Sequence, residues 1–247
     1  MSNNYFRFKQ FTINQEKSAF KVGTDGVLLG ACADLKGGNR ILDVGTGTGL
    51  IAIMVSQRSN AEIVAIEPEE NSYLEACENV LACKWNSRIR VENTGFQKYF
   101  SARNEKFDII ISNPPWFRNS LKNPDADKSA ARHTDSLSSS EILEGAVNLL
   151  KTEGSLQVIL PYAEGTLFIA EASQSGFFCN GIIKIKPIPT GDIKRLILKF
   201  ERIKKPLTEK FLTIETGNRH RYTEEYKKVT KEFYLTPSFP LSQERGG

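Results

Sequence analysis

The chain has 247 residues, of which 25% are charged and 40% hydrophobic, and its formal net charge is +4 at pH 7. This length suits one substantial domain with an elaborated edge, or at most two small ones. No apolar run approaches the roughly 18 residues that a membrane span requires, and residues 1–4 lack the basic and apolar segments of a signal peptide. The four cysteines form no C-x-x-C pair, so we expect free thiols and no metal site. These features predict a cytoplasmic protein with no membrane partner.

From Arg40 onward, short β-type segments alternate with helical segments, which favours a parallel sheet with crossover helices. A helix is expected to open within residues 20–30, before the first strand. The expected strands are Arg40–Val44, Glu62–Glu67, Arg88–Glu92, Phe107–Ser112 and Ser155–Leu160. The expected helices are Leu50–Gln57, one that starts at Pro68 and runs toward Cys83, one that follows the S-x-x-E capping box of Ser138 and Glu141 and runs to about Leu150, and Ala163–Ser175.

The pattern changes after the last of these helices. Gly181–Lys186 and Lys194–Glu201 are β-type runs joined by a Pro- and Gly-containing link that has no room for a helix. We therefore expect a hairpin, and with it one antiparallel strand near the C-terminal edge of the sheet. The whole pattern predicts an α/β protein with a seven-stranded, mostly parallel sheet and helices on both faces. We expect a single domain over residues 1–235, made of an N-terminal strand and helix cap (1–39), a core (40–201) and a C-terminal extension (202–235), followed by an irregular tail (236–247).

The C-terminal third is also the basic part of the chain. From Lys184 onward there are 15 Lys and Arg residues against 8 Asp and Glu residues. A basic segment on a near-neutral body is typical of contact with a polyanion. A solvated surface with excess lysine has the same composition, so the charge alone leaves both interpretations open.

A glycine-rich segment, Asp43-Val44-Gly45-Thr46-Gly47-Thr48-Gly49, connects the first expected strand of the core to its helix. Glycines in such a place let the backbone turn sharply and let a ligand approach it closely. The pattern is G-x-G-x-G, whereas a dinucleotide site would have G-x-G-x-x-G. An acidic residue at the mouth of the loop suits a cofactor with an amino group and would repel a pyrophosphate. Glu67, at the end of the second strand, can accept hydrogen bonds from two ribose hydroxyls because a carboxylate has only acceptors.

These residues resemble the class I S-adenosylmethionine-dependent methyltransferases, whose Rossmann-like fold has the sheet predicted above. The resemblance implies that the segment around residues 20–30 closes over the methionine end of the cofactor, with Lys21 or Thr24 at its carboxylate and Asp25 at its ammonium group. Many such enzymes carry an acidic residue after the third strand, where this chain has Thr94-Gly95-Phe96-Gln97. The implied cofactor-binding residues are Lys21, Thr24, Asp25, Asp43, Gly45, Thr46, Gly47, Gly49, Glu67 and Phe96.

The fourth expected strand ends in Asn113-Pro114-Pro115-Trp116. The side-chain oxygen of Asn113 and the carbonyl of Pro114 can each accept one hydrogen of an exocyclic amine, which frees the nitrogen lone pair for attack. The two prolines stiffen the backbone, so the carbonyl geometry is set before binding. Trp116 can stack on a base, a contact worth roughly 1–3 kcal/mol. The motif resembles that of amino methyltransferases acting on adenine, guanine or the glutamine side chain, most of which have Tyr or Phe where this chain has Trp; taken alone, it could also be a simple turn.

Over roughly residues 5–235 the chain resembles the bacterial tRNA1(Val) (adenine(37)-N6)-methyltransferases. The resemblance rests on Phe20–Gly30, Asn113–Phe117, the Ala131-Arg132-His133 segment with Leu137, and Tyr222–Tyr226 with Phe233–Leu235. It implies methyl transfer from S-adenosylmethionine to the N6 amine of adenosine 37, with the tRNA anticodon stem-loop as partner. We expect a monomer and assign His133 no catalytic role.

Several cations are candidates for phosphate contacts, although each can equally be a solvated surface charge. They are Arg118, Lys122, Lys128 and Arg132 in the loop after the motif, and Lys204, Lys205, Lys210, Arg219 and Arg221 in the basic third. Three other functions remain open at this point. They are a guanine-N2 methyltransferase of ribosomal RNA, a release-factor glutamine methyltransferase, and a non-catalytic RNA-binding module.

Overall fold

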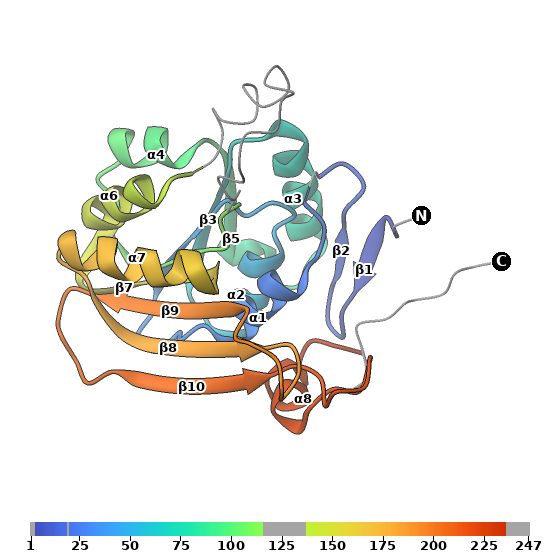
Figure 1. Cartoon of the computed structure of the whole chain (residues 1–247). Helices are drawn as coiled ribbons and strands as arrows, with labels where there is room; N and C mark the ends of the chain where they lie inside the picture. The colour runs from blue at the N-terminus through green and yellow to red at the C-terminus, as the bar shows by residue number, and fades with distance from the viewer. Residues whose placement is uncertain (1–2, 19, 116–136, 236–247) are drawn as a thin grey trace, which may run out of the picture.

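The computed structural model describes residues 3–18, 20–115 and 137–235. Its main element is an eight-stranded sheet with the order β10-β8-β9-β7-β6-β3-β4-β5 (Figure 1). The strands are β3 (Arg40–Val44), β4 (Glu62–Glu67), β5 (Ile89–Asn93), β6 (Phe107–Ser112), β7 (Leu150–Pro161), β8 (Phe178–Lys186), β9 (Arg195–Glu201) and β10 (Thr208–Thr213). Strand β9 is antiparallel to both of its neighbours, and the other neighbouring pairs are parallel. The parallel strands therefore all finish at one end of the sheet, the carboxyl end, and start at the opposite, amino end.

Helices cover both faces of this sheet (Figure 1). They are α1 (Thr24–Cys32), α2 (Leu50–Arg58), α3 (Glu70–Ala82), the short 3-10 helix η1 (Asn86–Arg88), α4 (Phe96–Ala102), α6 (Ser139–Leu149), α7 (Tyr162–Gln174) and α8 (Glu224–Thr230). One buried cluster joins the sheet to α1, α2, α3 and α8, and a second joins it to α4, α6 and α7. Ile41 of β3 enters the first cluster and Leu42 the second, which explains why the central strands are continuous apolar runs. None of the helices in the described ranges is long and apolar enough to cross a membrane.

Most of the predicted elements are confirmed. The bounds of β3, β4 and β6 are those predicted, and β8 and β9 form the expected hairpin. The capping box of α6 is present, since the Ser138 hydroxyl accepts the Glu141 N–H and the Glu141 carboxylate accepts the Ser138 N–H. The predicted start of helix α3 at Pro68 is wrong. Helix α3 begins at Glu70 because the Glu69 carboxylate caps it, accepting the N–H groups of residues 71 and 72.

The predicted count of seven strands is also wrong, because the C-terminal extension supplies an eighth. Strand β10 pairs in parallel with β8 at the edge of the sheet, with Phe211 opposite Lys184. The sequence of this strand, Thr-Glu-Lys-Phe-Leu-Thr, buries only Leu212, leaves Thr213 half-buried and exposes the other four side chains. An edge strand of this kind has too little apolar surface for the alternation from which strands are predicted.

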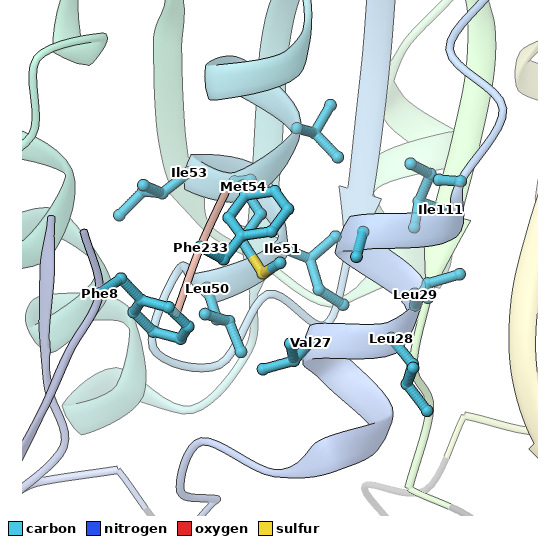
Figure 2. Packing of buried hydrophobic residues seen from close by; sticks show 14 of the residues in the cluster. Phe8, Val27, Leu28, Leu29, Leu50, Ile51, Ile53, Met54, Ile111 and Phe233 are labelled. Atoms are coloured by element: carbon cyan, nitrogen blue, oxygen red, sulfur yellow. The ribbon is translucent and has the colours of Figure 1, made fainter. Parts of the chain in front are cut away.

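The two ends of the described chain pack together. Strands β1 (Tyr5–Arg7) and β2 (Thr12–Asn14) form a separate two-stranded sheet, and the Lys9 N–H in the link between them donates to the Phe233 carbonyl at 2.7 Å. Figure 2 shows Phe8 and Phe233 beside α1 and α2, in one cluster with Val27 and Met54. These contacts support the proposal of one domain over residues 1–235. The tail, residues 236–247, lies outside the described residues.

Candidate active site

Three of the predicted polar residues meet at the carboxyl end of the sheet. Asp43 lies near the end of β3, Glu67 ends β4 and Asn113 directly follows β6. Val44 pairs with Ile66 on one side and with Ser112 on the other, so the three strand ends lie side by side. The strand order reverses between β3 and β6, and in open α/β sheets ligands bind in the crevice at such a point.

The glycine-rich loop between β3 and α2 presents bare backbone to this crevice. Gly45, Gly47 and Gly49 have φ angles of +71°, +56° and +82°, which L side chains rarely adopt. The loop is held to β4, since the N–H groups of Gly45 and Thr46 both donate to the Ile66 carbonyl at 3.0 Å. Within the described part of the chain, nothing lies within 4 Å of the positions that a Cβ would take on Gly45 or Gly47. The loop therefore has the open, side-chain-free surface that close approach of a ligand requires.

Asp43 is fully buried beneath this loop. Its Oδ2 accepts the Thr46 hydroxyl at 2.6 Å and the Ala52 N–H at 3.1 Å. Its Oδ1 is buried too, and among the described residues it has no hydrogen-bond partner. Burial raises the pKa of this carboxyl group to about 7, although its two hydrogen bonds act in the opposite direction. The unpartnered Oδ1 therefore fits a donor supplied by a ligand, such as the amino group predicted for the cofactor.

Glu67 joins the glycine-rich loop to the start of α3. Its Oε2 accepts the Gly47 N–H at 2.8 Å, and its Oε1 accepts the Glu69 N–H at 3.1 Å. The side chain is only 8% exposed, and burial raises its pKa despite these bonds. Each oxygen keeps a further lone pair, so the carboxylate can still accept two hydroxyl donors.

The first turn of α1 borders Asn113 from the other side. Asn113 is half-buried, and the neighbouring Ser112 hydroxyl donates to the Val44 carbonyl at 2.9 Å, which joins the ends of β6 and β3. A Cβ on Gly26 would lie 3.2 Å from Cδ2 of Leu50 and 3.9 Å from Nδ2 of Asn113. Helix α1 therefore passes close to both the candidate catalytic amide and the first residue of α2, with room for little more than a methyl group between them.

The three residues predicted at the methionine end of the cofactor lie at this helix start, but they differ in their contacts. Lys21 and Thr24 are exposed. The Asp25 carboxylate accepts the Nε–H of Arg195 at 2.8 Å, so one of its oxygens is already paired with a cation of the protein. Trp116, the aromatic residue of the motif, lies outside the described residues.

Comparisons with known proteins agree with this geometry. The family model described as the methyltransferase small domain matches residues 18–166. Two relatives, from Trichodesmium erythraeum and Bacteroides fragilis, are 44% and 43% identical to this chain, each over 95% of it and 99% of the relative. Both are named tRNA1(Val) (adenine(37)-N6)-methyltransferase. The chain belongs to this methyltransferase family.

Solved structures share the fold of this methyltransferase at much lower identity. A predicted O-methyltransferase from Agrobacterium tumefaciens superposes with a TM-score of 0.63 at 20% identity, over 85% of this chain and 96% of its own. The ribosomal protein L11 methylase of Lactobacillus delbrueckii subsp. bulgaricus gives 0.53 at 16% identity, over 77% and 84%. These likenesses show the Rossmann-like methyltransferase fold, as the sequence predicted.

The structure places Phe96 in the core of the methyltransferase. Its ring is 3% exposed, lies edge-on to Phe100 with centroids 5.4 Å apart, and covers Gly145 so closely that a Cβ there would lie 2.2 Å from it. The neighbouring Gln97 side chain hydrogen-bonds Glu141 and helps lower the pKa of that carboxyl group. A contact of the Phe96 ring with the cofactor stays a prediction, and its burial favours a packing role.

Two residues that sequence reasoning missed, Glu75 and Asn79, connect the glycine-rich loop to the N-terminal segment. Both lie one turn apart on α3 and are 1% exposed. Asn79 donates to the carbonyls of Asn14 and Thr48 at 2.9 Å each. The Glu75 carboxylate accepts the N–H groups of residues 16, 17 and 18. Polar residues four apart on the inner face of a helix were the available signal, because buried polar groups need partners.

The predicted RNA contacts in the C-terminal third lie at opposite ends of the sheet, except for Lys210, which lies within β10. Lys204 and Lys205 follow the last residue of β9, Glu201, which pairs with Ser155 and Phe178 at the amino end. Arg219 and Arg221 follow β10 at the carboxyl end, and both are exposed. Six residues of β10 separate the two groups by roughly 20 Å. This placement does not support a contact of Lys204 and Lys205 with phosphates close to a base held at Asn113. Arg118, Lys122, Lys128, Arg132 and His133 lie outside the described residues.

Proposed function

We propose that this methyltransferase transfers a methyl group from S-adenosylmethionine to the N6 amine of adenosine 37 in the anticodon loop of tRNA1(Val). The observation that carries the proposal is the likeness to enzymes of that name over 95% of this chain and 99% of theirs. The position of Asn113 beside the Asp43 loop supports the same chemistry. The proposed partner is the tRNA anticodon stem-loop, bound by a monomer in the cytoplasm.

The residues at the crevice are suited to hold the cofactor. We assign the buried Oδ1 of Asp43 to its ammonium group and Glu67 to its ribose hydroxyls, and the backbone of Gly45 to Gly49 forms the wall beside it. An ammonium donor near Asp43 would favour the charged carboxylate and so offset the burial that raises its pKa. When bound, S-adenosylmethionine supplies a methyl group on a positively charged sulfur, which is already a strong electrophile.

Asn113 and Pro114 then act on the nucleophile. The Oδ1 atom of Asn113 and the Pro114 carbonyl accept the two hydrogens of the adenine amine, which draws its lone pair out of conjugation with the ring. The ring of Pro115 has no N–H and a fixed φ, so it holds the Pro114 carbonyl in place. Methyl transfer forms the nitrogen–carbon bond as the carbon–sulfur bond breaks, and the sulfur keeps the bonding electron pair. The nitrogen then loses its extra proton to solvent, so catalysis is mainly a matter of positioning.

The test is to incubate the protein with radiolabelled S-adenosylmethionine and total RNA from a strain that lacks this enzyme, and to identify the labelled nucleoside after digestion. We expect N6-methyladenosine in the tRNA fraction, and its loss with the Asn113→Ala variant. Label in N2-methylguanosine would indicate that the base is guanine and not adenine. Label on protein with none in RNA would indicate glutamine methylation.

A further inference from the structure

The ion pair between Asp25 and Arg195 joins two segments that are 170 residues apart in the sequence. Asp25 lies in the first turn of α1, and Arg195 is the first residue of β9, at the carboxyl end of the sheet. The Arg195 guanidinium is fixed at two points, because its Nε donates to Asp25 at 2.8 Å and its Nη1 donates to the Lys194 carbonyl at 3.0 Å. Such a fixed cation makes a suitable anchor for the start of a helix.

Among the described residues, the first turn of α1 has few other anchors. Its N-cap residue is Gly23, which has no side chain to cap the helix, and Thr24 is exposed. The buried residues of the helix begin only at Gly26. The turn nevertheless passes close to both neighbours, since a Cβ on Gly26 would lie 3.2 Å from Leu50 and 3.9 Å from the Asn113 amide nitrogen. A displacement of this turn toward the crevice would therefore bring it into contact with the Asn113 amide.

We propose that Arg195 is a positioning residue for methyl transfer, which acts through Asp25 and the first turn of α1 to hold Asn113 in its reactive orientation. This inference rests on the proposed function and adds to it a residue outside both sequence motifs. It also gives Asp25 a different role from the one that the family resemblance implies. The carboxylate binds a cation of the protein in place of the cofactor ammonium group.

The same two elements offer a matched control. Lys199, on the same strand β9, pairs with Asp34 at 2.9 Å just beyond the other end of α1. The side-chain exposures are 27% and 41% for this pair and 37% and 36% for Arg195 and Asp25. The control pair therefore resembles the anchor in exposure and differs in its distance from Asn113. Lys199 also pairs with Glu201 at 3.4 Å, so its substitution should lower stability as well.

The experiment measures kcat, the KM for an anticodon stem-loop RNA and the Kd for S-adenosylmethionine in four variants. They are Arg195→Gln, Lys199→Gln, Asp25→Arg, and the double reversal Asp25→Arg with Arg195→Asp. We expect Arg195→Gln to lower kcat roughly 10-fold to 100-fold, since a shift of about 1 Å at a catalytic group can have such an effect. The Kd should change less than about threefold, because the lost interaction acts on the transition state. Lys199→Gln should leave kcat unchanged, and the double reversal should recover most of the activity that Asp25→Arg loses.

Amide hydrogen exchange of residues 23–28 provides a readout that needs no RNA. It should become faster in Arg195→Gln and stay at the wild-type rate in Lys199→Gln. If the wild type is active and Arg195→Gln has the same kcat and the same exchange rates, the inference is overturned and the proposed function stays intact. The double reversal could instead recover no activity while the Kd for S-adenosylmethionine is raised in both proteins that carry Asp25→Arg. That result would overturn the inference and indicate that Asp25 binds the cofactor ammonium group. If the wild type methylates no RNA, but exchange in residues 23–28 is still faster in Arg195→Gln than in the wild type, the result would count against the proposed function alone.

Discussion

Two buried acids at the carboxyl end of the sheet, Asp43 and Glu67, differ from two acids at its amino end in the direction of their pKa shifts. At the carboxyl end, burial raises the pKa of Asp43 and of Glu67, and Asp43 keeps one oxygen without a partner among the described residues. At the amino end, burial also acts to raise the pKa of Glu201, but hydrogen bonds from Lys205 and Asn180 and the charge of Lys199 outweigh it. The pKa of Glu201 is therefore lowered, and its charged form is stabilised.

The difference shows where the fold is built for stability and where for binding. Asp108, at the start of β6, follows the amino-end pattern, since Lys151 and the N–H groups of Asn39 and Arg40 lower its pKa. A protein that optimised only its own stability would satisfy the carboxyl end in the same way. A buried acid with a raised pKa and an oxygen without a partner among the described residues, as Asp43 has, indicates a group available to a ligand.

The largest expected effect comes from removing the amide at the carboxyl end. Asn113→Ala should lower kcat by about 100- to 1000-fold, the range found for loss of one positioned polar group that acts in the transition state. The Kd for S-adenosylmethionine should stay nearly constant, because Asn113 acts on the acceptor amine. The matched control is Asn180→Ala at the amino end, where the amide donates to Glu201 at 2.7 Å. It should lower the free energy of unfolding and leave kcat unchanged; the opposite result for either variant would contradict the comparison.

The second expected effect is on stability as a function of pH. The folded-state pKa of Asp43 is raised to about 7, so its protonated form stabilises the fold below the ordinary value near 4, and this contribution is lost as the pH rises through 7. In the protein without cofactor, this amounts to about 3 kcal/mol of unfolding free energy between pH 4 and 7, at about 1.4 kcal/mol for each pH unit. Urea denaturation should therefore show the wild type losing stability over this range relative to Asp43→Asn.

The isosteric Asp43→Asn variant keeps a side chain that can accept the Thr46 hydroxyl, so the comparison isolates the charge. A constant difference between the two proteins from pH 4 to 7 would mean that Asp43 ionises in the folded protein as it does in the unfolded chain. Glu201 gives the opposite sign, because a lowered pKa contributes stability above its ordinary value that is lost as the pH falls. Glu201→Gln should accordingly destabilise the protein more at pH 7 than at pH 3.

The carboxyl end was largely predictable from the sequence, because its signals are local. The strands β3, β4 and β6 are apolar runs that stop at polar or glycine residues, and the functional groups lie at or beside those stops. The glycine pattern after Asp43 and the acid at Glu67 needed only the order of the elements to be placed together. Asn113 was found for the same reason.

The remaining contacts depend on packing between distant segments. Arg195 and Asp25 are 170 residues apart, and the Asn79 amide reaches Asn14 across 65 residues, so no local pattern announces either contact. The burial of Phe96 depends on the absence of a side chain at Gly145, which only the packing of α4 on α6 reveals. Strand β10 was missed because an exposed edge strand lacks the apolar alternation of a buried one.

The smallest expected effect concerns RNA affinity, and it tests whether the two ends of the sheet also differ toward the substrate. Arg219 and Arg221 lie at the carboxyl end, exposed and with no ion pair among the described residues. Lys204 and Lys205 lie at the amino end, where Lys205 is held by Glu201 at 2.9 Å. Phosphates close to a base held at Asn113 can reach the first pair of residues more easily than the second. Reversal of Arg219 and Arg221 to Glu should therefore raise the Kd for an anticodon stem-loop roughly 10-fold at low salt and flatten its salt dependence.

The matched variant, Lys204→Glu with Lys205→Glu, changes the net charge by the same amount. A long-range electrostatic effect that depends only on net charge would weaken RNA binding equally in both variants. Fluorescence anisotropy at several salt concentrations would show this. We expect the amino-end variant to bind the stem-loop with nearly the wild-type Kd and salt slope, because its cations lie roughly 20 Å farther along the sheet. The reverse ranking would place the RNA across the amino end, and substrate would then have to extend past β10 to reach Asn113. The pair of variants thus decides between phosphate contacts at the carboxyl end of the sheet and a diffuse attraction by the whole basic third.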